Sequence, residues 1–271
     1  MPAPAVSIVM PLYNAGPFLS EAIDSILQQH FTNFEFIILN DGSSDDSESI
    51  IQRYRDERIR YFRNEQNRGL AYTLNRGLHE AVAPLITRMD ADDIALPERL
   101  QVQFEYMEQH PEADLVAAIV ELIDADGKPM GYWKEDHEHT EPADIQSYLA
   151  ENNCIAHPTV MARKDIMLSL GYRAEQGEAE DYDLWLRWVS AGYSIHKINQ
   201  VLLRHRILPK SFTRQRQRNV FFKLAAVKAR FIWNEVSHHR CNDFMLMTGL
   251  MALADLARGT GKAVKKILQA S

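Results

Sequence analysis

The first 90 residues alternate between two hydrophobic patterns. Short continuous apolar runs are typical of buried strands, whereas apolar positions three and four apart are typical of helices. The apolar runs predict strands at residues 6–10, 34–39, 58–62 and 85–89. Helical spacing predicts helices at 18–27, from Ser44 or Asp45 onwards, and at 70–81. Strands and helices that alternate through short connections predict a mostly parallel sheet with helices on both faces, an α/β fold.

The pattern is less regular in the rest of the chain. It predicts helices from Pro97 to about His110 and at 180–189, with strands at 113–123, 157–162 and within 195–206. The polar, turn-rich stretch 124–140 predicts an exposed excursion. From Ser211 onwards the sequence is helical in pattern, basic and rich in methionine.

Composition narrows the class of protein. With 46% hydrophobic and 25% charged residues, the 271-residue chain has the composition of a globular protein, which excludes disorder, collagen and pure coiled coil. Two cysteines, Cys154 and Cys241, are too few for a disulfide framework or a four-cysteine zinc site, and we expect buried thiols in a reducing compartment. No apolar run approaches the roughly 18 residues of a membrane span, and the N-terminus lacks a signal-peptide pattern. These features predict a cytoplasmic protein.

The net charge of −7 is unevenly distributed. Residues 204–271 carry 14 Lys and Arg against 3 Asp and Glu, so the acidic excess belongs to the rest of the chain. Basic residues interleaved with aromatic ones are typical of amphipathic helices at an anionic membrane surface. Alternatively, these helices pack on the rest of the protein and their basic residues face water. A nucleic-acid partner is not expected, because the main body is acidic and carries no nucleic-acid motif.

Polar clusters follow three of the predicted strands, at residues 13–14, 40–43 and 90–93. Ligands of parallel α/β sheets bind beyond the carboxyl ends of the strands, so we expect the clusters to line one rim. Asp90, Asp92 and Asp93 repel one another, and a divalent cation would remove that repulsion. The alternative is a solvated acidic turn. No glycine-rich phosphate loop follows the first strand, which argues against dinucleotide and P-loop chemistry.

Five motifs occur in a specific order along the chain: SIVMPLYN at 7–14, NDGSSD at 40–45, NRG at 67–69, DADD at 90–93 and EDYDLWLR at 180–187. Over roughly residues 5–212 the chain resembles family 2 glycosyltransferases of bacterial surface-polysaccharide synthesis. The resemblance implies the GT-A fold and transfer of a sugar, with inversion, from a nucleotide-sugar, UDP-linked, to a glycan or lipid-linked acceptor. It divides the chain into a GT-A domain at 1–212 (nucleotide-binding half 1–100, acceptor-binding half 101–212) and a basic amphipathic helical extension at 213–271.

The resemblance also implies a role for each motif residue. Asp181 corresponds to the general base, and Asp92 to the direct ligand of Mg²⁺ or Mn²⁺. The implied nucleotide-sugar contacts are Pro11, Tyr13, Asn14, Asp41, Asn67, Gly69, Asp90 and Asp92. Candidate contacts to the acceptor or the diphosphate are Asp93, His157, Glu180, Arg206 and Ser211. In an inverting displacement one carboxylate accepts the proton of the acceptor hydroxyl, and no covalent enzyme nucleophile is needed.

Each motif residue also has an explanation that involves no ligand. Asp41 could be a turn residue before Gly42, and the acidic residues at 180–183 could favour a helix N-terminus through its dipole. His157 could be a buried, hydrogen-bonded histidine, and residues 204–206 a solvated basic loop.

Two further pairs of residues are expected to have no role in a site. Trp185 and Trp188, three positions apart, are expected in the core. His137 and His139 lie beside acidic residues like a metal cluster, but their polar loop favours solvent exposure.

Two rival functions fit the same α/β rim. A sugar nucleotidyltransferase would need a basic, glycine-rich loop after the first strand, and residues 14–17 contain no Lys or Arg. A catalytically silent nucleotide-sugar-binding module is disfavoured by the presence of Asp41, Asp92 and Asp181.

Overall fold

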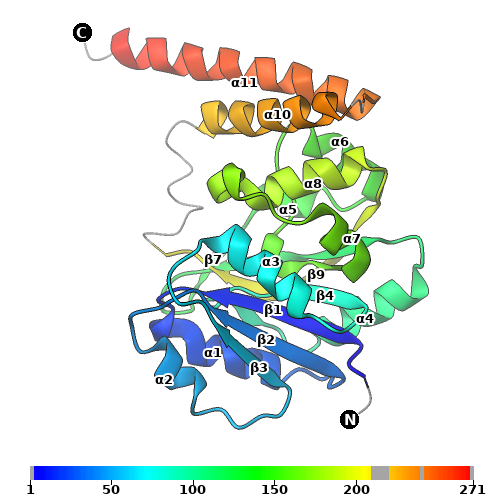
Figure 1. Ribbon diagram of the computed structural model, residues 1–271. Helices are drawn as coiled ribbons and strands as arrows, with labels where there is room; N and C mark the ends of the chain where they lie inside the picture. Colours follow the sequence, from blue (N-terminus) through cyan, green and yellow to red (C-terminus); the bar gives the residue numbers. More distant parts are fainter. Residues whose placement is uncertain (1–2, 209–219, 239–240, 269–271) are drawn as a thin grey trace.

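The computed structural model describes residues 3–208, 220–238 and 241–268 (Figure 1). A twisted sheet lies between the helices α1 and α2 on one side and a layer that includes α7 and α8 on the other, with α10 and α11 stacked above that layer (Figure 1). Within the described residues nine strands form one mixed sheet, in the order β3-β2-β1-β4-β8-β6-β9-β5, and β7 pairs with β6.

The strands are β1 (Val6–Leu12), β2 (Phe34–Asn40), β3 (Ile59–Arg63), β4 (Leu85–Arg88), β5 (Ile94–Ala95), β6 (Leu115–Ile123), β7 (Pro129–Tyr132), β8 (Met161–Arg163) and β9 (Ile195–Arg206). The helices are α1 (Gly16–Leu27), α2 (Ser47–Ile51), α3 (Leu70–Glu80), α4 (Arg99–Gln109), α5 (Lys134–Glu138), α6 (Pro142–Leu149), α7 (Lys164–Leu170), α8 (Glu180–Ser190), α10 (Val220–Ser237) and α11 (Asp243–Leu268). Short 3₁₀ helices are η1 (His157–Thr159) and η2 (Ala174–Ala179).

The first four strands are the parallel part of the sheet that the sequence predicts. Alternate residues face opposite layers: Ile8 packs in one core cluster with Ile23 of α1, whereas Val9 packs in another with Leu74 and Leu78 of α3. Both faces of β1 and β2 are covered, which explains why these two strands are nearly continuous apolar runs in the sequence. The α/β prediction is confirmed.

The predicted strand at 157–162 is only partly present. Its first three residues form η1, and β8 begins at Met161. Pro158 fixes φ and has no amide hydrogen to donate to a neighbouring strand, so it suits the start of a 3₁₀ turn better than a sheet interior. β8 then runs antiparallel between β4 and β6.

The expectation of an exposed excursion at 124–140 is confirmed for most of the stretch: all four residues of β7 are exposed. Asp136 of α5 is the exception among these residues, because it is fully buried, with Lys197 Nζ 3.0 Å from its Oδ1. The ion pair is what allows this carboxylate to be buried. Cys154 is buried as expected, whereas Cys241, which lies between α10 and α11, is exposed.

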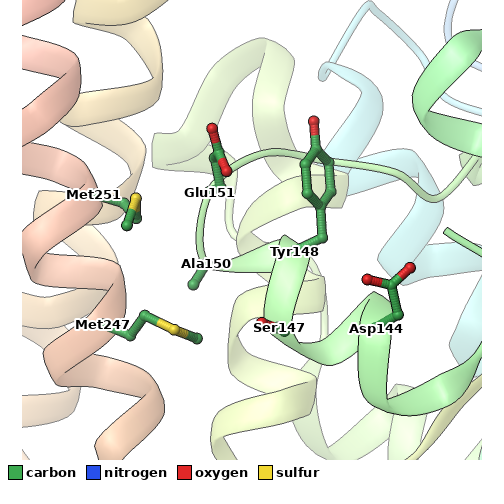
Figure 2. Close-up of a pocket in the computed structure, with 7 residues that line it drawn as sticks. All are labelled: Asp144, Ser147, Tyr148, Ala150, Glu151, Met247 and Met251. Carbon is green, nitrogen blue, oxygen red and sulfur yellow. The ribbon is translucent and has the colours of Figure 1, made fainter. Parts of the chain in front are cut away.

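The C-terminal hairpin, defined here as α10 and α11, packs on α8. Val227 and Phe231 of α10 belong to the same core cluster as Trp185 and Trp188, which are fully buried as the sequence predicts. A cavity of about 160 Å³ remains between α6 and α11; Figure 2 shows the methionines of α11 on one side of it. No helix in the described part of the chain is long and apolar enough to cross a membrane. The expected boundary at 212/213, like Ser211 and the basic residues 214–218, lies outside the described residues.

Candidate active site

Asp41, at the end of β2, is held by the loop 64–69. Its Oδ1 accepts hydrogen bonds from Asn64 Nδ2 at 2.7 Å and from the Arg68 amide at 2.9 Å, and its Oδ2 accepts one from the Gly69 amide at 2.9 Å. The loop approaches so closely that a Cβ on Gly42, whose φ is +72°, would lie 2.6 Å from the Gln66 carbonyl carbon. Only glycine suits this position. The second and third sequence motifs therefore form one structural unit.

Asn14 joins the first motif to the same unit. The backbone amide of Asn14 donates to Ser43 Oγ at 3.0 Å, and its side-chain Oδ1 accepts from the backbone amide of Ser44 at 2.9 Å. Next to it Tyr13 is 51% exposed, which leaves an aromatic surface at the rim, whereas Pro11 is buried within β1. Asn67 is exposed, and its side-chain oxygen accepts from the Gly69 amide.

The acidic cluster after β4 has a histidine partner from β9. Asp93 is 1% exposed and accepts from the Arg206 amide at 2.8 Å, and His205 Nδ1 lies 3.0 Å from both of its carboxylate oxygens. Among the described residues, Asp90, Asp93 and His205 form a group whose potential ligand atoms lie within 4.8 Å of one another. Asp92 is half-buried beside them and is not part of this group.

The electrostatics of the cluster suit a cation. Burial and the neighbouring charges of Asp93 and Asp90 raise the pKa of Asp92 to about 7. Burial alone would lower the pKa of His205, but the charge of Asp93 and its hydrogen bond raise it to about 9. The site therefore retains protons that a divalent cation could replace, and carboxylate oxygens with an imidazole nitrogen suit Mn²⁺ or, with fewer nitrogen ligands, Mg²⁺.

Arg206 is 2% exposed and contacts the acidic cluster from the protein interior. Its Nε donates to the Asp92 carbonyl oxygen at 2.8 Å, and its Nη1 donates to the carbonyl oxygens of Asp124 and Ala125. These bonds make Arg206 a support of the Asp92 peptide. Its predicted contact with the diphosphate stays a prediction, and Ser211 lies outside the described residues.

Arg88 holds Asp90 of the acidic cluster and is influenced by charges from the last motif. Its Nη1 donates to Asp90 Oδ2 at 2.7 Å, and its Nη2 donates to the other oxygen of the same carboxylate. Burial opposes the charge on Arg88, but the negative charges of Asp90 and Glu180 outweigh it, so the pKa of Arg88 is raised. Residues 90 and 180, far apart in the sequence, thus act on one guanidinium.

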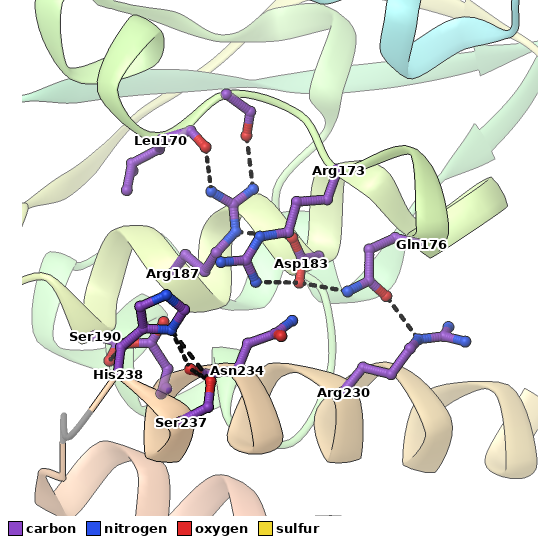
Figure 3. A network of polar contacts seen from close by, with 12 residues as sticks. Leu170, Arg173, Gln176, Asp183, Arg187, Ser190, Arg230, Asn234, Ser237 and His238 are labelled. Atoms are coloured by element: carbon purple, nitrogen blue, oxygen red, sulfur yellow. Dashed lines mark hydrogen bonds and ion pairs between the residues drawn. The ribbon is translucent and has the colours of Figure 1, made fainter.

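Asp181 lies in the first turn of α8 and is 9% exposed. Its Oδ2 accepts a hydrogen bond from Asn153 Nδ2 at 3.0 Å. Asp183 has a different environment: it is fully buried, accepts from Gln176 at 2.8 Å and pairs with Arg187 at 2.8 Å (Figure 3). Asp183 is therefore held inside the fold, whereas Asp181 is the less buried of the two carboxylates and has a polar partner in Asn153.

The histidines of the sequence analysis lie in two environments. His157 is 6% exposed, and its Nε2 lies 2.8 Å from the hydroxyl of Tyr172, which agrees with the buried, hydrogen-bonded alternative. His137 and His139 are half-buried rather than exposed, and neither belongs to the cation-binding group found among the described residues. His139 instead stacks on Tyr148, with 3.7 Å between ring centroids.

Comparison with known proteins identifies the family. The family model for glycosyl transferase family 2 matches residues 7–168. This chain belongs to glycosyl transferase family 2. An uncharacterized glycosyltransferase of Methanocaldococcus jannaschii is 36% identical over 211 residues, which cover 76% of this chain and 72% of the relative. The O-antigen biosynthesis glycosyltransferase WbnJ of Escherichia coli is 30% identical and covers 87% of this chain and 95% of its own.

A third relative of this glycosyltransferase has a defined reaction in its name. It is the UDP-Gal:alpha-D-GlcNAc-diphosphoundecaprenol beta-1,3-galactosyltransferase of Escherichia coli, 27% identical over 90% of this chain and 88% of its own.

Solved structures confirm the GT-A fold of this glycosyltransferase. TarS of S. aureus in complex with UDP has a TM-score of 0.66 at 18% identity and covers 93% of this chain and 71% of its own. A Pyrobaculum calidifontis mannosyltransferase in complex with GDP-Man and Mn²⁺ has a TM-score of 0.67 at 16% identity, over 97% and 75% of the two chains.

Sequence reasoning missed three residues of this glycosyltransferase site. Arg88 is a charged residue inside an apolar strand directly before the DADD motif, and that position was an available signal. Arg99 is fully buried in α4 and donates to the Arg88 carbonyl oxygen at 2.8 Å. Asn153 carries no signal in the sequence, because its contact with Asp181 spans 28 residues.

Proposed function

We propose that this glycosyltransferase moves a hexose or N-acetylhexosamine from a UDP-sugar, with inversion, to a glycan or lipid-linked acceptor in surface-polysaccharide synthesis. The observation that carries the proposal is the group formed by Asp90, Asp93 and His205 beside Asp92, with Asp90 held by Arg88. The names of two relatives, in O-antigen synthesis and in galactosyl transfer to a diphosphoundecaprenol-linked sugar, support the class of substrate.

The nucleotide is proposed to bind at the unit formed by Tyr13, Asn14, Asp41 and the loop 64–69. The exposed ring of Tyr13 can stack on a base. A carboxylate offers roughly four acceptor positions, and loop 64–69 donates three hydrogen bonds to Asp41. One position therefore remains for a ring N–H such as that of uracil. The UDP bound to the TarS structure supports this choice of nucleotide.

Asp92 is proposed as a ligand of Mg²⁺ or Mn²⁺, together with residues of the group Asp90, Asp93 and His205. Such a cation, when bound, neutralises charge on the departing diphosphate. The protein's own contribution is to hold the carboxylates in place: Arg88 fixes Asp90 from one side, and Arg206 fixes the peptide of Asp92 from behind. A Mn²⁺ ion in the mannosyltransferase of the same fold supports this assignment.

Asp181 is proposed as the general base. The acceptor oxygen forms a bond with the anomeric carbon while the bond from that carbon to the UDP oxygen breaks, and the hydroxyl proton passes to the Asp181 carboxylate. UDP departs with the bonding electrons. Asn153 orients the carboxylate through its 3.0 Å hydrogen bond.

The first experiment compares purified Asp181→Asn and Asp92→Ala with the unchanged protein. UDP release and product mass are measured with UDP-galactose, UDP-glucose and UDP-N-acetylglucosamine, with and without Mn²⁺. We expect both variants to lose transfer, and Asp181→Asn to keep the thermal stabilisation that UDP gives the folded state. Near-normal turnover in Asp181→Asn would contradict the general-base assignment. Pyrophosphate release from UTP and a sugar 1-phosphate would support a nucleotidyltransferase instead, and binding without turnover a silent module.

An anionic membrane surface is the partner proposed for the C-terminal hairpin, which would place the enzyme at the cytoplasmic side of the membrane. Four leucines of α11 are 44–70% exposed: Leu246, Leu250, Leu253 and Leu256. Lys265 and Lys266 follow them in the sequence, and such a face can lie in a lipid interface. Flotation with phosphatidylglycerol vesicles tests this: Leu250→Gln/Leu253→Gln should release the protein. Equal flotation with neutral vesicles, or none at all, would refute an anionic surface.

A further inference from the structure

The contacts of α10 point to a role for the C-terminal hairpin in the catalytic site itself. We propose that Lys228 and Arg230 are positioning residues, which hold the two chain segments that place Asp181. The proposal rests on the assignment of Asp181 as the general base. It gives the hairpin a function in sugar transfer that is independent of membrane binding.

Lys228 holds the first segment. This lysine is fully buried, and its Nζ donates to the Glu151 carbonyl oxygen at 2.6 Å and to Asp255 Oδ2 of α11 at 2.7 Å. Two residues beyond Glu151, Asn153 donates its hydrogen bond to Asp181. The backbone that carries Asn153 is thus attached to α10, and through Asp255 to α11 as well.

Arg230, two residues further along α10, holds the second segment. Its Nε donates to Gln176 Oε1 at 2.9 Å, and Gln176 in turn donates from Nε2 to Asp183 Oδ1 at 2.8 Å (Figure 3). Asp183 lies two residues after Asp181 in the first turn of α8. The chain of contacts Arg230–Gln176–Asp183 therefore fixes the end of α8 that carries Asp181.

The first segment is held both by apolar packing and by polar contacts: Ala150, Cys154 and Ile155 are buried in the core, whereas Glu151 lies at its exposed edge. The cavity between α6 and α11 lies beside it, lined by Asp144, Ser147, Tyr148, Ala150, Glu151, Met247 and Met251 (Figure 2). Side chains next to a cavity lose contacts on one side, so packing restrains them less. The hydrogen bond from Lys228 to the Glu151 carbonyl oxygen adds a restraint at this edge of the segment.

The kinetic consequence follows from geometry. A base must stand within hydrogen-bond reach of the acceptor hydroxyl, and a misplacement of about 1 Å can lower the rate of a positioned reaction about 100-fold. The donor site lies on other elements, β1, β2 and the loop 64–69. Loss of the α10 contacts should therefore lower kcat and leave the KM for the UDP-sugar unchanged.

Arg230 is the better position to test. Replacing Lys228 would leave Asp255 buried without its cation, which risks unfolding, whereas Arg230 is exposed. The experiment compares Arg230→Gln, Arg230→Lys and a control, Lys262→Gln, in the full chain. Lys262 is an exposed cation of α11 that lies over the Phe221 ring, within the hairpin. Melting temperatures establish that each variant is folded, and the rate of UDP release from the UDP-sugars above, with water as acceptor, gives kcat and KM.

We expect Arg230→Gln to lose about 10-fold in kcat at unchanged KM, and Arg230→Lys to recover part of it because its amine can donate to Gln176. Lys262→Gln should match the unchanged protein. An unchanged kcat in Arg230→Gln, or an equal loss in the control, would overturn the proposal. Normal turnover in Asp181→Asn alone would instead overturn the proposed function.

Discussion

Asp41→Asn separates the structural and the nucleotide-binding contributions of one carboxylate. The amide of asparagine has one acceptor oxygen and one NH₂ group. If its oxygen keeps the bonds from Asn64 and Arg68, its NH₂ faces the Gly69 amide, which now donates to Asp41 at 2.9 Å. At least one hydrogen bond to a charged, 4% exposed acceptor is lost. Such bonds contribute about 1.5–3 kcal/mol each, so we expect the free energy of unfolding to fall by that amount.

Urea denaturation without ligand measures this loss, and titration with UDP measures binding separately. The matched control is Asp46→Asn, because Asp46 is exposed on the same turn and its side chain does not cap α2. The control should change stability by less than about 0.5 kcal/mol. If Asp41→Asn were as stable as the control while UDP binding was lost, the three contacts with the loop 64–69 would carry no net energy, and the reasoning from them would be refuted.

Three further predictions concern other parts of the molecule. Lys197→Met should cost about 3–5 kcal/mol because it leaves Asp136 buried without its cation, and Lys197→Met/Asp136→Leu should recover most of that in urea denaturation; a single-variant loss under about 1 kcal/mol would contradict this. In the native protein a thiol reagent should label exposed Cys241 and spare Cys154, whose burial raises its pKa to about 12, until urea is added. His205→Ala should weaken Mn²⁺ binding about tenfold in calorimetric titration; unchanged binding would remove His205 from the metal group.

The fold of residues 1–100 could be predicted from the sequence because its signals are local. Strands β1 and β2 are buried along their whole length and form nearly continuous apolar runs, and each is followed by a polar cluster. The pairings within this part follow from the short connections of a parallel sheet. The sequence therefore predicts Asn14 and Asp41 at one rim, and in the structure Asn14 contacts Ser43 and Ser44, which follow Asp41 closely in the chain.

The contacts of residues 101–212 could not be predicted in the same way, because they join residues that are far apart in the chain. His205 meets Asp93 across 112 residues, and Asn153 meets Asp181 across 28. A local sequence pattern also gave a wrong prediction where a single residue determined the structure or the burial. Pro158 changed a strand into a 3₁₀ turn, and the pairing with Lys197 buried Asp136 in a stretch that is otherwise polar.

Some basic residues of the C-terminal hairpin pair with groups inside the protein, so the positive charge counted along the sequence is larger than the charge available to an external partner. Lys228 is neutralised inside the fold by Asp255, and Arg258 lies 3.7 Å from both Glu151 and Asp255. Arg230 donates to Gln176. Part of the excess positive charge is thus used to attach the hairpin to the acidic body. A membrane partner, if flotation detects one, must then depend on the leucines of α11 and on the basic residues beyond these contacts. Neutralising Arg230 should change the rate of transfer and leave flotation unaltered.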